Sequence, residues 1–156
     1  MQSTTFPEDD LRRFIQQIAR SSGFLESVQR SHEHAGVRLS VSETFALGEL
    51  AEAGALSQQE LAARLGLEKS TVSRLAAGME ERGWLSRERD ADDRRLYRLQ
   101  LTAVGRDVAE RVGAELSEHH SRLLARLSHE ERHALGVGLG ALVRELDATH
   151  QEHGHH

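Results

Sequence analysis

Residues 57–101 constrain the fold of this chain more than any other stretch, because they predict two short helices and a hairpin in direct succession. Ser57 can begin the first helix: its side chain can accept from the backbone amide of Glu60, and the glutamate can reach back to the serine amide. Gly66 ends that helix, and a second amphipathic helix stops at Gly83. Two helices joined by a turn of about three residues form a helix-turn-helix, whose second helix enters the major groove of DNA.

A charged hairpin is expected directly after the second helix. Residues 97–101 alternate apolar and polar side chains, and this period of two predicts a half-buried strand. The segment 90–95, Asp-Ala-Asp-Asp-Arg-Arg, is turn-like and carries arginines. Such a wing can straddle a phosphate backbone and place an arginine in the minor groove, where negative potential is concentrated. The alternative is a solvated turn whose Asp and Arg residues only pair with each other, but the position directly after a helix-turn-helix favours the wing.

Six short motifs occur in order between residues 39 and 105. They are Leu39-Ser40-Val41-Ser42-Glu43, Gln59-Glu60-Leu61-Ala62, Glu68-Lys69-Ser70-Thr71-Val72-Ser73-Arg74-Leu75, Glu81-Arg82-Gly83, Asp93-Arg94-Arg95 and Leu101-Thr102-Ala103-Val104-Gly105. Together they resemble the successive motifs of the MarR family of winged helix-turn-helix transcriptional regulators. The resemblance implies a DNA-binding regulator rather than an enzyme: a homodimeric repressor that a small molecule releases from a palindromic operator. One departure is Asp92, which stands where the family's wing often carries a basic residue.

The fold class that follows is mainly α, a winged helix-turn-helix domain flanked by long N- and C-terminal dimerisation helices. We expect a single domain over residues 1–156, with the DNA-binding unit at 40–101 and the helical dimerisation region at 8–34 and 103–147. Residues 149–156 are expected to form a disordered, histidine-rich tail. Long helices with one apolar stripe each cannot bury themselves around so small a unit, and packing them across a two-fold axis would solve this. A dimer would present two recognition helices to half-sites about one helical turn apart.

The flanking regions carry their own local signals. Apolar residues at helical spacing from Leu11 onward predict a helix to about Ser31, followed by a polar loop at 32–36. Ser40 with Glu43 predicts a capping box at the start of a helix that runs to about Ala53, and Ser128 with Glu131 predicts one at the start of the last helix. Glycine costs about 1 kcal/mol against alanine inside a helix but permits close helix approach. We therefore expect a subunit contact at Gly136, Gly138 and Gly140.

The second helix and the wing supply the candidate DNA contacts. The candidates for base-edge or flanking phosphate contacts are Gln58, Ser70, Thr71, Ser73 and Arg74. Contacts mainly to phosphate are expected from Lys69, Arg87, Arg89 and Arg94. Arg95 is expected to enter the minor groove, held by Asp93.

Composition sets limits on the class of protein. The chain has no cysteine, which excludes disulfides, thiolate metal sites and thiol redox sensing. A net charge of −5 argues against a nonspecific nucleic-acid coat. The N-terminus has neither a basic region nor an apolar block, and no run of apolar residues is long enough to span a membrane. We expect a cytoplasmic protein without a cofactor.

Ten histidines raise two metal-binding alternatives. The segment His129-Glu130-Glu131-Arg132-His133 matches the H-E-x-x-H motif of zinc peptidases. Zinc catalysis would also need a third protein ligand and a cleft, so exposed histidines at a helix start are the simpler interpretation. The other alternative is a metal-sensing regulator with ligands from His32, His34, Glu118, His119 and His120. Zinc sensors of the family carry a Glu-His pair at positions that here are Thr44 and Phe45, which weakens this alternative.

A small-molecule effector is what the resemblance implies instead. In the family, anionic aromatic compounds bind between the helical dimer region and the DNA-reading unit, and this sets the spacing of the recognition helices. The residues of this chain that could line such a pocket are His34, Arg38 and Phe45.

Overall fold

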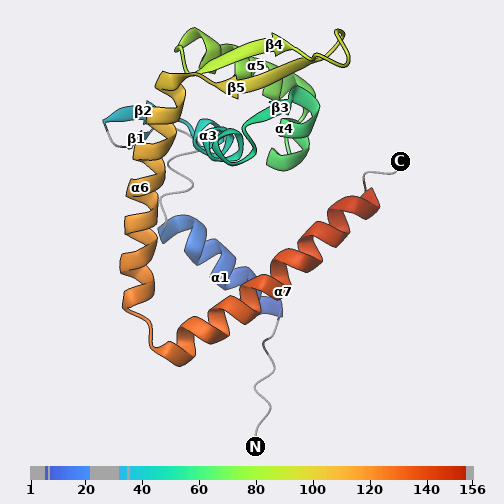
Figure 1. Cartoon of the computed structure of the whole chain (residues 1–156). Coiled ribbons are helices and arrows are strands. Elements are labelled where there is room, and N and C mark those ends of the chain that lie inside the picture. Colours follow the sequence, from blue (N-terminus) through green and yellow to red (C-terminus); the bar gives the residue numbers. More distant parts are fainter. Residues whose placement is uncertain (1–5, 7, 22–31, 35, 154–156) are drawn as a thin grey trace, which may run out of the picture. The chain divides into compact units, whose positions relative to one another are not determined.

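The computed structural model describes residues 6, 8–21, 32–34 and 36–153 (Figure 1). Its elements are α1 (Glu8–Ser21), β1 (His32–His34), β2 (Val37–Leu39), α3 (Val41–Ala53), β3 (Ala55–Ser57), α4 (Gln58–Leu65), α5 (Lys69–Glu81), β4 (Leu85–Arg89), β5 (Tyr97–Leu101), α6 (Ala103–Ala125) and α7 (His129–His153). The chain divides into two compact units, residues 1–115 and 116–156, and the division falls within the sequence of α6. The predicted class, a mainly α winged helix-turn-helix protein, is confirmed.

The helix boundaries follow the local signals of the sequence. All three predicted capping boxes form, and in each the serine hydroxyl accepts from the amide of the glutamate while the carboxylate accepts from the serine amide: Ser40 with Glu43, Ser57 with Glu60, and Ser128 with Glu131. Gly66 ends α4 in the left-handed region at φ 64°, which a residue with a Cβ rarely adopts. These helix boundaries therefore depend on residues that lie within one helical turn of each other, and the sequence alone could predict them.

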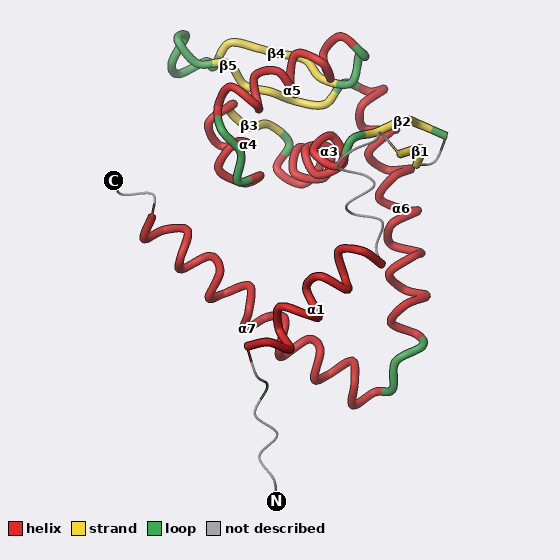
Figure 2. The backbone as a smooth tube through the Cα atoms, turned by 180° about the vertical axis from the view of Figure 1, so that it is seen from behind, coloured by secondary structure: helices red, strands yellow, loops and turns green. Residues whose placement is uncertain are grey.

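The core of the first unit lies between α3, α4, α5 and a three-stranded antiparallel sheet (Figures 1 and 2). The strand order is β3-β5-β4, so β5 is central and its Leu99 pairs with Leu56 on one side and Arg87 on the other. The largest fully buried side chains are Leu39, Leu47, Leu50, Leu61, Val72, Met79 and Leu99. These residues fix α5 against the sheet that carries the wing.

The junction between the wing and α6 depends on one glycine. A Cβ added at Gly105 would overlap the carbonyl oxygen of Trp84 and would lie 2.8 Å from its carbonyl carbon. That oxygen accepts from the Thr102 amide at 2.9 Å, and the Thr102 hydroxyl donates to the Gly83 carbonyl at 2.6 Å. Trp84 is buried at this junction between helix and wing.

Two predicted boundaries are wrong. The polar loop expected at 32–36 contains β1, which pairs antiparallel with β2 so that Glu33 stands opposite Arg38. Strands of three residues are too short to show a clear alternation in the sequence. The tail expected from residue 149 is helical as far as His153, because no proline or glycine occurs between Gly140 and Gly154. The part of the first helix expected at 22–31, and residues 154–156, lie outside the described residues.

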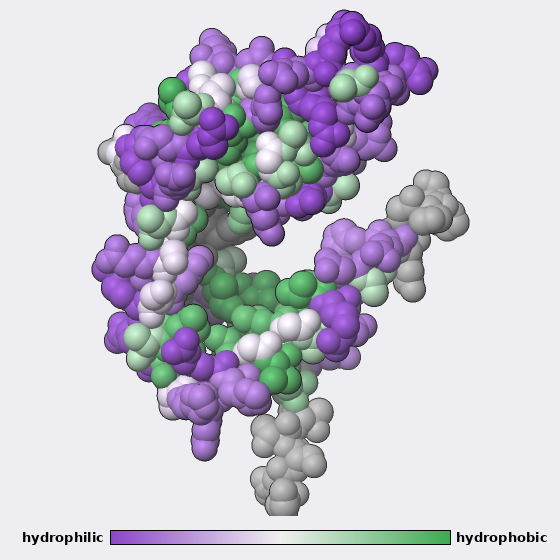
Figure 3. Space-filling model, viewed as in Figure 1, coloured by the Kyte–Doolittle hydropathy of each residue, from purple (hydrophilic) through white to green (hydrophobic). Residues whose placement is uncertain are grey.

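The second unit presents a largely exposed helix α7. Its described side chains include none that is buried, and its large apolar residues Leu135, Val137, Leu139, Val143 and Leu146 are exposed. Figure 3 shows apolar side chains at the surface along this helix. In the first unit, α1 likewise exposes Phe14, Ile15 and Ile18. Helices of this kind have apolar faces that a further surface could cover.

Candidate nucleic-acid interface

Helix α5 presents a polar surface at its N-terminal half. Its buried stripe consists of Val72, Ala76 and Met79. On the remaining surface, Lys69, Ser70 and Arg74 are exposed, while Thr71 and Ser73 are half-buried. All five of these candidate DNA contacts therefore lie on one helix, outside its packed stripe.

The tip of the wing is organised by Asp90, which sequence reasoning missed. One carboxylate oxygen accepts from the amides of Asp92 at 2.8 Å and Asp93 at 3.1 Å, and the other pairs with Arg98 at 3.2 Å. Arg98 also donates to the Ala55 carbonyl at 3.1 Å, which ties the tip to β3. The Asp92 amide first, then the Asp93 amide and Arg98, hold the pKa of Asp90 below its ordinary value of 3.8. The sequence did carry a signal for this contact, because an aspartate in a turn often accepts from the backbone amide two residues further on.

Asp93 holds Arg95, as predicted. The carboxylate accepts from the Arg95 amide at 3.1 Å and from its Nε at 3.2 Å, with Nη2 at 3.4 Å. The Arg95 side chain is nevertheless 90% exposed. The turn that carries it extends away from the sheet in both backbone views (Figures 1 and 2). Arg95 is thus both oriented and accessible, and its place in the minor groove stays a prediction.

The other two tip residues are also arranged by local contacts. Arg89 lies over the ring of Tyr97, with 5.0 Å from its guanidinium carbon to the ring centroid, and it donates to the carbonyl of Arg94. The side chain of Arg94 is exposed. Both residues therefore remain available as the phosphate contacts that were predicted.

Arg87 is engaged inside the unit. Its guanidinium pairs with Glu80 at 3.0 Å, donates to the amide oxygen of Gln58 at 3.2 Å, and donates to the Ser73 carbonyl at 3.5 Å. Two predicted DNA contacts, Arg87 and Gln58, thus meet in one cluster together with a glutamate that the sequence analysis did not single out. The spacing of these residues along the chain gave no signal for the cluster.

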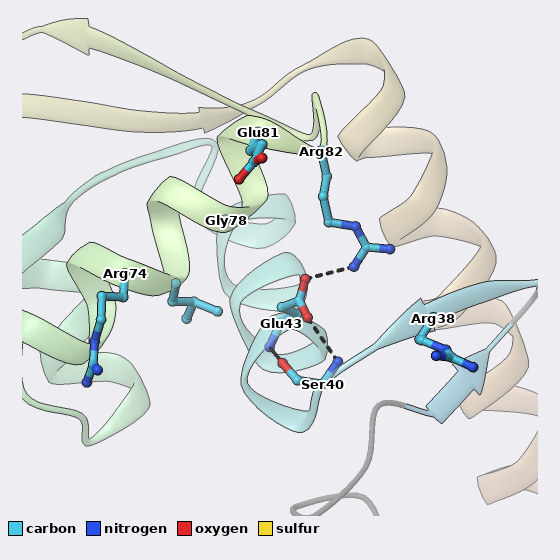
Figure 4. A pocket seen from close by; sticks show the side chains of 8 residues that line it. Arg38, Ser40, Glu43, Arg74, Gly78, Glu81 and Arg82 are labelled. Carbon is cyan, nitrogen blue, oxygen red and sulfur yellow. Dashed lines mark hydrogen bonds and ion pairs between the residues drawn. The ribbon is translucent and has the colours of Figure 1, made fainter.

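A cavity of about 440 Å³ lies beside α5 (Figure 4). It is lined by Arg38, Ser40, Glu43, Arg74, Leu75, Gly78, Glu81 and Arg82. Arg82 pairs with Glu43 at 3.0 Å and stacks on Trp84 at 3.6 Å from the ring centroid. Of the residues predicted to line an effector pocket, Arg38 lines this cavity and Phe45 does not. The side chain of His34 lies outside the described residues.

Two of the residues in the metal-sensing alternative, His32 and His34, have side chains outside the described residues. Among the side chains that the structure describes, no group of three or more His, Asp or Glu residues is gathered so that it could hold a metal ion. His129 and His133 lie in the first turns of α7. Glu118 pairs with Arg122 at 3.9 Å, and the rings of His119 and His120 lie 5.9 Å apart.

No helix in the described ranges is long and apolar enough to cross a membrane.

Helices α4 and α5 pack together through their apolar faces, and the polar face of α5 is exposed. A hairpin with an oriented arginine follows them. This arrangement defines a winged helix-turn-helix DNA-binding protein. The family model described as "MarR family" matches residues 39–96. The chain is 27% identical over 131 residues to the transcriptional repressor MprA of Escherichia coli (strain K12), covering 84% of this chain and 74% of the relative.

Solved structures share this fold. Streptococcus pneumoniae FabT in complex with DNA has a TM-score of 0.79 at 21% identity, covering 92% of this chain and 99% of that one. PcaV of Streptomyces coelicolor, in complex with its natural ligand, has a TM-score of 0.67 at 26% identity, covering 96% of this chain and 99% of that one. Residues 39–96 match the MarR family, and the chain is a DNA-binding transcriptional regulator.

Proposed function

We propose that this chain is a homodimeric repressor that binds a palindromic duplex operator and is released from it by a small organic anion. The observation that carries the proposal is the pairing of an exposed, polar α5 with a wing whose Arg95 is aligned by Asp93. A repressor is favoured because MprA, a relative along most of its length, is a transcriptional repressor.

In this proposal the two elements divide the DNA contacts. The polar side chains of α5 enter the major groove, where Arg74 has the reach and the donors for a bidentate contact to guanine. Lys69, Arg89 and Arg94 contact phosphate, and Arg95 enters the minor groove. Ser70, Thr71 and Ser73 contact base edges or flanking phosphates.

The homodimer is supported by the apolar surface of α7. Five large apolar side chains are exposed on this helix, and covering them would remove apolar area from water. No described atom lies within 4 Å of a Cβ added at Gly136, Gly138 or Gly140, so the interior of this chain gives no reason for glycine there. A second copy of the chain is the partner that symmetry favours.

The cavity beside α5 supports a small anionic effector. The Arg82–Glu43 pair neutralises itself, whereas Arg38 and Arg74 have no ion-pair partner among the described residues. Since Glu81 is the one further acid in the lining, the cavity carries a positive excess. An anion that engaged Arg74 would withdraw a side chain of the recognition helix from DNA.

Selection of bound duplexes from a random library tests the DNA-binding part of the proposal. We expect enrichment of an imperfect palindrome with half-sites about one helical turn apart, bound by two copies of the chain. Sedimentation of the free protein and of the complex gives the stoichiometry. A monomer that shows no preference for any duplex over bulk competitor would refute the proposal.

Benzoate is a suitable probe for the effector site. It should lower operator affinity in the wild type and fail to do so in Arg38→Ala, which changes the cavity without touching a candidate DNA contact. Phe45→Ala is the matched control, because its exposed ring does not line the cavity. Equal responses of the two variants would show that the anion acts elsewhere.

A further inference from the structure

We propose that Arg87 does not touch DNA but positions Gln58, whose amide nitrogen then donates to a phosphate. The inference rests on the proposed DNA-binding surface and assigns separate roles to two of its residues. It replaces the expectation, drawn from the sequence, that Arg87 is itself a phosphate contact.

The donors of Arg87 are directed into the protein. Nε lies 3.0 Å from the Glu80 carboxylate, Nη1 lies 3.2 Å from the Gln58 amide oxygen, and Nη2 lies 3.5 Å from the Ser73 carbonyl. Only 25% of the Arg87 side chain is exposed. Glu80 neutralises the guanidinium charge, so little of that charge remains to attract a phosphate.

The chemistry of the guanidinium fixes the orientation of Gln58. A guanidinium only donates, so the oxygen of the Gln58 amide faces it and the amino group faces away. Gln58 is the first residue of α4, the helix that precedes the recognition helix. In helix-turn-helix proteins this first helix crosses the DNA backbone. An amino group in this position is a donor for a phosphate oxygen, whereas a rotated amide would present its oxygen and be repelled.

A charge-conserving variant isolates the positioning role. Arg87→Met combined with Glu80→Gln removes the ion pair without changing net charge. We expect about a tenfold loss of affinity for the selected operator, the size of one hydrogen bond to a charged group. The slope of log affinity against log salt should not change, because no cation has left a phosphate.

A double-mutant cycle with Gln58→Ala shows whether Arg87 acts through Gln58. Gln58→Ala alone should cost a similar factor, and adding the Arg87/Glu80 changes to it should cost less than about twofold more. A merely structural role of the ion pair would cost the same factor in both backgrounds. The control is Arg64→Met with Glu49→Gln, which removes a 3.0 Å ion pair of the same unit and should leave affinity unchanged.

Three results would overturn the inference. A slope reduced by about 0.9 in the Arg87 variant would mean that Arg87 itself neutralises a phosphate. Fully additive losses would mean that Arg87 and Gln58 act independently. Unchanged affinity in Gln58→Glu, which can keep its bond to Arg87 and hence the fold, would mean that the amino group touches nothing. A wild-type chain that binds no duplex would refute the proposed function itself, at the first measurement.

Discussion

Adding one methyl group at Gly105 should loosen the attachment of the wing to α6. In Gly105→Ala the new Cβ overlaps the Trp84 carbonyl oxygen, so the start of α6 has to move away from the turn between α5 and β4. This movement lengthens the bond from the Thr102 amide to that same oxygen, now 2.9 Å. The position of the Cβ is fixed by the backbone of α6 and its partner is a backbone oxygen, so no side-chain rotation can relieve the contact.

The expected loss can be worked out from its parts. Overpacking costs about 1–3 kcal/mol. A weakened backbone hydrogen bond adds about 1 kcal/mol. Replacing glycine by alanine inside a helix returns about 1 kcal/mol. The free energy of unfolding should therefore fall by about 2 kcal/mol.

Urea unfolding followed by circular dichroism measures this change, with protein concentration held fixed because a dimer makes stability concentration-dependent. Gly113→Ala is the matched control in the same helix, because no described atom lies within 4 Å of a Cβ added at Gly113. Alanine at this position should raise the free energy of unfolding by up to about 1 kcal/mol. If the two variants unfold at the same urea concentration, the close approach to Trp84 does not constrain the fold.

Three further outcomes are expected. Arg95→Ala should weaken operator binding while helix content and dimerisation stay intact, and unchanged affinity in a filter-binding assay would reject the wing assignment. Arg74→Ala should relax discrimination at particular base pairs by about 1–3 kcal/mol, whereas a uniform loss across a panel of duplexes would make it a phosphate contact. The folded pKa of Asp90 lies below 3.8, so its contribution to wing stability is present above pH 3.8 and is lost as the pH falls through the folded value. Asp90→Asn should remove that acid-dependent step from hydrogen exchange of the wing amides, and an unchanged step would assign it to another group.

The local signals of the sequence determined where elements begin and end. A capping box needs two residues three positions apart, and the motif is complete before any tertiary contact forms, so all three boxes were predictable. The same is true of the Asp93–Arg95 contact, whose partners are two residues apart. The short β1–β2 hairpin escaped prediction because each strand holds only three residues.

The tertiary structure decided which of the predicted contacts remain available to DNA. Gln58, Glu80 and Arg87 belong to three different elements, and only the packing of α4, α5 and β4 brings them within hydrogen-bond distance. Their sequence separations of 7 to 29 residues follow no local period. The sequence by itself therefore indicated the resemblance to the MarR family, the elements of the helix-turn-helix and wing, and a set of polar candidates. The fold decided that one candidate arginine is neutralised and that another, Arg74, borders a cavity, because charge pairing depends on distance in space and not on position along the chain.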